Sequence, residues 1–249
     1  MICINAAGVR IVDTFAMLSC IDTFDKFALR VLPASLPEDM RCAVRALSRK
    51  TVLAAGKQLE CGQKNATLVY VCGGATKLVA HASEHREQVV AFHFAGDLLT
   101  LPACGPHSYS LEALVESELL TLEYEPFLEI TGERADILGQ LLERTTISLQ
   151  RSREKTLALG RKSAIERVCS FLLMMAERIG KPGCGGVELD LPMSRRDIAD
   201  SLGLTIETIS RQFTHLREQG LITTRGRSAV LLLRMDELEK RSGHLSAAA

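Results

Sequence analysis

The most constraining feature of this sequence lies near its C-terminus, where two short amphipathic segments are separated by a glycine. Residues 193–222 read MSRRDIADSLGLTIETISRQFTHLREQGLI. Ser194 followed three positions later by Asp197 forms a capping box, which marks the start of a helix. Gly203 suits the tight turn after that helix, and Thr205 can cap a second one. Two capped helices joined by a glycine turn predict a helix-turn-helix.

The second of these helices has a core face and an outer face. Its apolar residues are three or four positions apart, as a single buried stripe requires: Ile206, Ile209, Phe213 and Leu216. The outer face carries Glu207, Ser210 and Arg211, where a recognition helix presents side chains to the major groove. Arginine can donate two hydrogen bonds to guanine, glutamate can accept one from cytosine, and serine can bond a base edge. These three are the expected base-reading residues.

Basic side chains flank this unit where a DNA backbone is expected to pass. Strand-like residues 221–224 and 228–233 enclose an Arg-Gly-Arg turn, which predicts a two-stranded wing. Phosphate contacts are typical of helix starts and wing tips, and the candidates are Arg195, Arg196, Thr205, Arg225 and Arg227. The net charge of the chain is zero, but it is −5 over residues 1–150 and +5 over residues 151–249. A basic half favours a polyanionic partner, and we predict double-stranded DNA.

The first half of the chain has a different pattern. From residue 51 to about 127, short apolar runs alternate with glycine-containing turns, and the clearest strands are residues 68–72, 89–94 and 119–124. This pattern predicts an antiparallel barrel or roll. Residues 36–49 are expected to form a short helix before it, and residues 1–20, which lack a clear period, a loose arm.

A long helix is predicted between the two halves, from about Pro126 to Gly160. Its apolar residues form a near-heptad stripe, and a second copy of the chain is the simplest partner for such a stripe. The expected dimer contacts are Ile137, Leu138, Leu141, Leu142, Thr145 and Leu149. A second helix is predicted over residues 163–180, followed by a flexible turn at 181–186 and a short strand at 187–191.

Composition and motifs exclude several classes of protein. No apolar run approaches the length of a membrane span, and the N-terminus lacks the pattern of a signal peptide. Eight cysteines in a chain of 249 residues without such a signal favour reduced thiols in the cytoplasm. The chain has no phosphate-binding Walker loop, no zinc-spaced set of Cys and His, and no nucleophile elbow. We therefore expect neither an enzyme nor a metal site.

These motifs together resemble the family of the cyclic-AMP receptor protein and FNR over about residues 45–235. Glu207-x-x-Ser210-Arg211 is similar to the pattern of the FNR/FixK branch, and Phe92–Leu98 resembles the FNR-like roll. The resemblance implies an α+β fold with an N-terminal antiparallel β-roll like that of cyclic-nucleotide-binding domains, a long dimerisation helix and a C-terminal winged helix-turn-helix. The implied division is an arm (1–35), a roll (36–127), a dimerisation helix (128–160) and a DNA-binding domain (161–249).

The resemblance also carries expectations about function. It implies a homodimeric bacterial transcription regulator, usually an activator that contacts RNA polymerase. It implies an operator similar to TTGAT-N4-ATCAA, with half-sites one helical turn apart. By analogy with the FNR/FixK branch, the regulated genes are linked to low oxygen or respiration.

Two ligands of the family fit this sequence poorly. A cyclic-AMP pocket needs a Gly-Glu acid and an arginine for the phosphate, but Gly96 precedes Asp97 here, and residues 108–114 contain no arginine. A buried phosphate without a cation is costly. An iron–sulfur cluster needs four ligands. This N-terminus offers only Cys3 and Cys20, and Leu120 stands where the resemblance places the fourth cysteine, in the roll. The sequence therefore predicts a FixK-like regulator without an evident cofactor.

Four other interpretations stay open. A cluster rebuilt from other thiols could use Cys42, Cys61, Cys72 or Cys104. Cys184, in a Gly/Pro turn, is a candidate redox thiol, and haem could use His81, His85 or His93. In a different class, the chain is a ligand-binding roll whose C-terminal unit makes only protein contacts.

Overall fold

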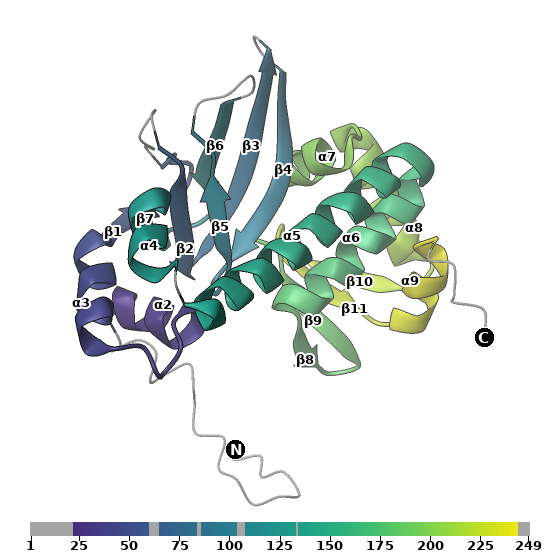
Figure 1. Ribbon diagram of the computed structural model, residues 1–249. Coiled ribbons are helices and arrows are strands. Elements are labelled where there is room, and N and C mark those ends of the chain that lie inside the picture. The colour runs from purple at the N-terminus through teal and green to yellow at the C-terminus, as the bar shows by residue number, and fades with distance from the viewer. Residues whose placement is uncertain (1–21, 60–64, 84–85, 104–107, 133, 244–249) are drawn as a thin grey trace, which may run out of the picture.

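The computed structural model describes residues 22–243, apart from 60–64, 84–85, 104–107 and 133. Figure 1 shows an N-terminal antiparallel roll and a C-terminal domain of helices around a small sheet, with a long helix crossing between them. The predicted α+β architecture is confirmed. No helix in the described residues is long and apolar enough to cross a membrane. The arm expected over residues 1–20 lies outside them.

The roll consists of two antiparallel sheets. The first has the order β1-β7-β2-β5 and contains β1 (Arg49–Leu53), β7 (Ser117–Glu123), β2 (Thr67–Gly73) and β5 (Leu98–Leu101). The second has the order β4-β3-β6 and contains β4 (Arg86–Phe94), β3 (Ala75–Ser83) and β6 (Ser108–Ala113). Strand residues from both sheets, among them Val69, Leu111 and Leu119, form an apolar cluster. The three strands predicted at residues 68–72, 89–94 and 119–124 are confirmed.

Part of the segment predicted as an arm is a helix. Thr23–Val31 form α2, and Asp22 caps it by accepting a hydrogen bond from the main-chain N–H of Thr23. The ring of Phe27 is fully buried and packs edge-on against Tyr70 of β2 at 5.6 Å. Helix α2 therefore belongs to the core of the roll. The helix predicted over residues 36–49 is confirmed as α3 (Glu38–Leu47).

The single long helix predicted from about Pro126 to Gly160 is instead two helices. The first, α4 (Tyr124–Thr131), ends at Gly132, and the second, α5, runs from Ala135 to Arg161. The break lets Phe127 and Ile137 enter the same apolar cluster beside α2 and the first sheet. Ile137 is fully buried there. Its assignment to a dimer contact is therefore corrected: it packs inside its own chain.

The C-terminal domain begins with α6 (Ala164–Ile179), which the capping box of Ser163 and Glu166 starts as predicted. Its sheet has the order β10-β11-β9-β8 and contains β10 (Ile222–Arg225), β11 (Ala229–Leu232), β9 (Gly186–Asp190) and β8 (Lys181–Gly183). The predicted two-stranded wing is thus half of a larger sheet. Residues 181–183, predicted as part of a turn, pair with β9. The last helix is α9 (Met235–Arg241).

The two domains share one apolar core. The cluster that fills the C-terminal domain includes Val89, Phe92 and Phe94 of β4. Phe92 packs edge-on against Phe171 of α6, with 6.2 Å between ring centroids. Arg178 of α6 donates a hydrogen bond to the carbonyl of Phe92 at 2.7 Å and forms an ion pair with Asp97. The second sheet of the roll is therefore a packing surface for the C-terminal domain.

His93, on β4 at this junction, generates a prediction about acid stability. Burial lowers its pKa from 6.5 to about 4 even though Asp97 lies 3.8 Å from Nδ1. In the unfolded chain this histidine binds a proton near pH 6.5, whereas in the folded chain it stays neutral until about pH 4. The free energy of unfolding therefore falls as the pH drops from 6.5 towards 4. Between pH 7.5 and pH 5, we expect the free energy of unfolding of wild type to fall by about 2 kcal/mol more than that of His93→Gln. Urea unfolding of both proteins at the two pH values measures this difference, and parallel losses would contradict it.

Candidate nucleic-acid interface

The predicted helix-turn-helix is present, and local interactions define its ends. The first helix, α7 (Arg195–Leu202), starts with the capping box of Ser194 and Asp197, in which both reciprocal hydrogen bonds form. It ends at Gly203, whose φ of 61° is the left-handed conformation that glycine adopts without strain. The second helix, α8 (Ile206–Glu218), is capped by the Thr205 hydroxyl, which accepts from the N–H of Thr208 at 3.2 Å.

Helix α8 has the two predicted faces. Ile209, Phe213 and Leu216 are buried in the shared core, whereas Ile206, assigned to the same stripe, is 37% exposed. Glu207, Ser210 and Arg211 are all exposed on the other face. The Ser210 hydroxyl donates to the carbonyl of Ile206 at 2.9 Å. The pKa of Glu207 is lowered by hydrogen bonds from the main-chain N–H of Glu207 and from the Thr205 hydroxyl, and by the charge of Arg211. This carboxylate is therefore an acceptor of hydrogen bonds at neutral pH.

The phosphate candidates near α7 differ from one another. Arg196 is exposed and forms no ion pair with the residues that the structure describes. Arg195 is half-buried, and its guanidinium lies over the ring of Phe213, 3.7 Å from the centroid. Burial lowers the pKa of Arg195. This arginine therefore packs α7 onto α8, while Arg196 is available to solvent.

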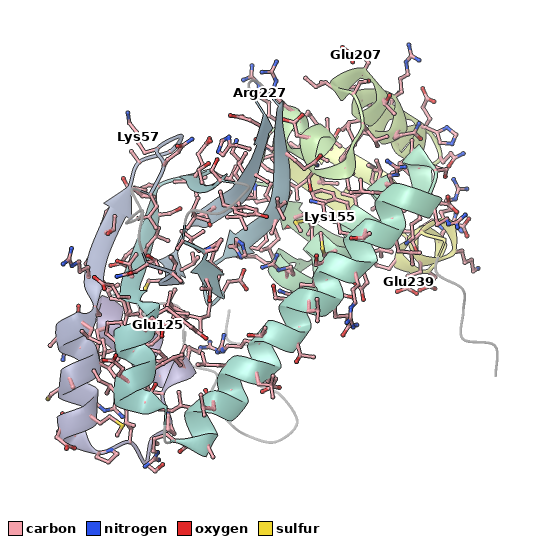
Figure 2. The ribbon with its side chains drawn as sticks, turned by 45° about the horizontal axis from the view of Figure 1, so that its top comes forward. Lys57, Glu125, Lys155, Glu207, Arg227 and Glu239 are labelled. Atoms are coloured by element: carbon pink, nitrogen blue, oxygen red, sulfur yellow. The ribbon has the colours of Figure 1, made fainter. Side chains whose placement is uncertain are left out.

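Arg225 and Arg227 also occupy different places on the wing. Arg227 is exposed beside Gly226, whose φ is 64°, in the turn between β10 and β11. Figure 2 shows Arg227 and Glu207 along the same upper edge of the molecule. Arg225 lines a cleft of about 810 Å³ between the wing sheet and the roll, which Gly74 and Val115 border on the roll side. Arg227 is thus placed at the tip and Arg225 at the inner side of the wing.

An apolar seam remains exposed along α5. Leu138, Leu142 and Leu149 are 40%, 68% and 48% exposed, and the exposed Thr145 lies between them. Leu141 is only partly exposed, because it packs against the cluster that contains Ile137. The candidate dimer seam is therefore narrower than the sequence stripe. Ile147 and Leu157, which the sequence interpretation did not select, are further exposed apolar residues of this helix.

The sequence interpretation also missed Lys155, which lies in the C-terminal half of α5 (Figure 2). Its Nζ donates to the carbonyls of Val89 and Val90 at 2.6 and 2.8 Å and to the Ser201 hydroxyl at 3.1 Å. Burial lowers the pKa of Lys155 to about 8. Lys155 lies about five helical turns after the buried Ile137, which places both on one face of α5. This helical spacing from Ile137 was the only feature of the sequence that could have indicated a buried position for Lys155.

The candidate cofactor ligands do not converge. Thr76, not His81, pairs with His93 across β3 and β4, and the His81 ring instead bonds Ser110 at 2.9 Å. Burial raises the pKa of Cys72 to about 12, so that this thiol stays protonated at neutral pH. Within the part of the chain that the structure describes, no three His, Cys, Asp or Glu side chains form a metal-binding group. His85 and four candidate or family-position cysteines lie outside it: Cys3, Cys20, Cys61 and Cys104.

Two residues singled out for ligands have other surroundings. Asp97, which stands at the acid position of a cyclic-AMP pocket in the resemblance, accepts from the N–H of Phe94 at 2.8 Å and pairs with Arg178. Cys184 is exposed as a free thiol between β8 and β9, beside Gly185. Asp97 is therefore part of the contact between the domains, and Cys184 is accessible to oxidants.

Known proteins are similar to this chain in sequence and in structure. The Crp-like helix-turn-helix domain family matches residues 166–241. The nitrogen fixation regulation protein FixK of Rhizobium meliloti is 36% identical over 177 residues, which cover 71% of this chain and 79% of that protein. The fumarate and nitrate reduction regulatory protein of Escherichia coli is 27% identical over 201 residues, covering 80% of each. The structure of FixK2 from Bradyrhizobium japonicum superposes with a TM-score of 0.70 at 30% identity and covers 81% of this chain and 99% of that one.

Proposed function

This chain belongs to the CRP/FNR family of transcription regulators, and we propose that it acts as a homodimer that reads a palindrome similar to TTGAT-N4-ATCAA. In this proposal α8 of each protomer enters the major groove of one half-site. Glu207, Ser210 and Arg211 contact base edges, and Arg196, Thr205 and Arg227 contact phosphates. Arg225 joins the phosphate contacts if the duplex reaches the inner side of the wing, whereas Arg195 supports α8 from beneath.

One observation carries this proposal above the others. Glu207, Ser210 and Arg211 are exposed on a helix whose opposite face, with Ile209 and Phe213, is buried in the core. Arg211 forms no ion pair with any residue that the structure describes, so its guanidinium is free to donate two parallel hydrogen bonds. A helix held by its core face and free on its polar face is what base reading requires.

The seam of α5 supports the dimer. Leu138, Leu142, Thr145 and Leu149 are four, three and four positions apart, which is the spacing of a two-stranded coiled coil. A twofold axis along this seam relates two α8 helices, and a palindromic operator has the same symmetry.

The relatives extend the proposal to physiology. FixK is named for nitrogen fixation, and the second relative is named for the reduction of fumarate and nitrate. We therefore place this regulator in the cytoplasm of a bacterium, where it contacts RNA polymerase as an activator of genes for low-oxygen or respiratory metabolism. The surroundings of Asp97 and the separation of His81 from His93 favour control without a bound nucleotide or haem.

The proposed function is tested by fluorescence anisotropy of protein purified in air, with a TTGAT-N4-ATCAA duplex and a scrambled duplex. We expect tight binding to the palindrome alone. Arg211→Ala should weaken that binding by about 1–3 kcal/mol and leave scrambled DNA nearly unchanged, because it removes a base contact. An equal loss on both duplexes would contradict the base-reading role.

The dimer seam is tested by Leu142→Glu. Two charges facing each other in an apolar interface are costly, so we expect the dimer to dissociate. Light scattering should then give the mass of one chain, 27.2 kDa, in place of twice that value. Gln150→Glu, which adds a charge on α5 away from the seam, should keep the dimer. A Leu142→Glu protein that stays dimeric would remove this seam from the interface.

Arg195 and Arg227 should behave differently when each is replaced by alanine. Arg227→Ala should weaken binding to every duplex and flatten its salt dependence by about one phosphate contact. Arg195→Ala should lower the free energy of unfolding by about 1 kcal/mol, because it removes the guanidinium from the Phe213 ring. Urea unfolding and salt titrations on both variants separate the roles. A flattened salt slope for Arg195→Ala would return it to the phosphate contacts.

A further inference from the structure

Helix α7 is held from outside its own domain by three polar contacts. Lys77 of β3 donates to the carboxylate of Asp197 at 2.7 Å. Gln88 of β4 donates to the carbonyl of Asp200, and Lys155 of α5 donates to the Ser201 hydroxyl. Asp197, Asp200 and Ser201 are three and four positions apart, so they lie on one face of α7. The roll and α5 thus both form polar contacts with one side of α7, the first helix of the helix-turn-helix (Figure 1).

The contact of Lys77 is mostly shielded from solvent. Lys77, Asp197 and Glu112 have side chains that are 16%, 12% and 25% exposed, and Lys77 lies 3.1 Å from Glu112 of β6. Burial alone raises the pKa of Asp197, but hydrogen bonds from Lys77 and Ser194 outweigh it and leave that pKa lowered. Both partners are therefore charged. Removing one member of such a pair leaves an uncompensated buried charge, so the contact tolerates little displacement.

Asp197 has a second role that links this ion pair to the DNA-binding helices. Its carboxylate accepts hydrogen bonds from the N–H of Ser194 at 2.9 Å and from the Ser194 hydroxyl at 2.6 Å. The first of these, together with the bond from the Asp197 N–H to the Ser194 hydroxyl at 3.2 Å, forms the capping box that starts α7. Lys77 therefore binds the N-terminal end of α7 itself. Because Ile198 of α7 and Ile209 of α8 are buried in the same cluster, the orientation of α7 is transmitted to α8.

We propose that Lys77 is a positioning residue, which fixes the orientation of α8 relative to the roll and α5 through its mostly shielded ion pair with Asp197. This rests on the proposed function of a dimer that reads a palindrome. Two α8 helices held at fixed separation can enter two half-sites together, without a further cost of ordering on binding. A fixed separation also makes the protein strict about the spacing of those half-sites.

Half-site spacing is therefore the measurement that reports on Lys77. Anisotropy with the full-length protein compares the palindrome with its four-base-pair spacer and one with a six-base-pair spacer, in which the half-sites are rotated and moved apart. Wild type should strongly prefer the first. Lys77→Met should bind the first about tenfold more weakly and show a preference at least about fivefold smaller, because α8 is less constrained. Lys77→Arg, which keeps the charge, should restore the preference.

Two further variants separate positioning from stability. Lys26→Met breaks the ion pair between Lys26 and Glu118, which are 2.8 Å apart. The side chains of this pair are shielded from solvent to a similar degree, but the pair lies inside the roll and away from α7. This variant should lower the unfolding midpoint and leave the spacing preference unchanged. Asp197→Asn should reproduce the effect of Lys77→Met, and the double variant should add nothing further, as expected for two residues that act through one contact.

The outcomes are distinguishable. An unchanged spacing preference in Lys77→Met, or tighter binding to the palindrome, would overturn the positioning role. If wild type does not bind the palindrome specifically, the proposed function fails. Hydrogen exchange of α7 then tests, without DNA, whether Lys77 holds this helix in place. Amides of residues 195–202 should exchange faster in Lys77→Met than in Lys26→Met. Equal exchange in the two variants would overturn the proposal.

Discussion

The arrangement of this molecule depends on the apolar core that the roll shares with the C-terminal domain. Phe92 of the roll and Phe171 of α6 meet inside it, and Ile209 of the recognition helix belongs to the same cluster. Apolar burial is strong but non-directional, so it holds the domains together without fixing their angle. The surrounding polar contacts, from Lys77 to Asp197 and from Arg178 to Asp97, have defined geometry. These directional contacts, rather than the apolar core, are therefore the interactions that can set the angle between the domains.

The helix-turn-helix was predictable because its determinants are close together in the sequence. The capping box of Ser194 and Asp197 spans four residues, and Gly203 ends α7 through its own left-handed conformation. The period of α8 then decides which side chains are buried and which are exposed. Only Ile206, in its first turn, is more exposed than the stripe suggests. The strands of the roll followed in the same way, from short apolar runs bounded by turns.

The packing of α5 and α2 was not predictable, because it depends on segments far apart in the chain. A heptad pattern marks apolar positions but does not say whether they face the same chain or a second copy. Ile137 and Leu138 are neighbours in the stripe, yet Ile137 is fully buried beside Phe27, whereas Leu138 is 40% exposed. Lys155 and Lys77 carry no local signal at all. Their roles arise only because β3, β4 and α5 lie against one side of α7 in the folded chain.

Asp97 shows how a residue at the ligand position of the resemblance can serve the contact between the domains. In the resemblance to the cyclic-AMP receptor protein, the residue after Gly96 is the acid that binds the ribose. Here that carboxylate accepts from Arg178 of the C-terminal domain and from the N–H of Phe94. The Arg178 guanidinium, mostly shielded and stacked over Phe94, requires this partner, since an unpaired charge is costly there. The carboxylate at the effector position of the resemblance thus joins the roll to the DNA-binding domain in this chain.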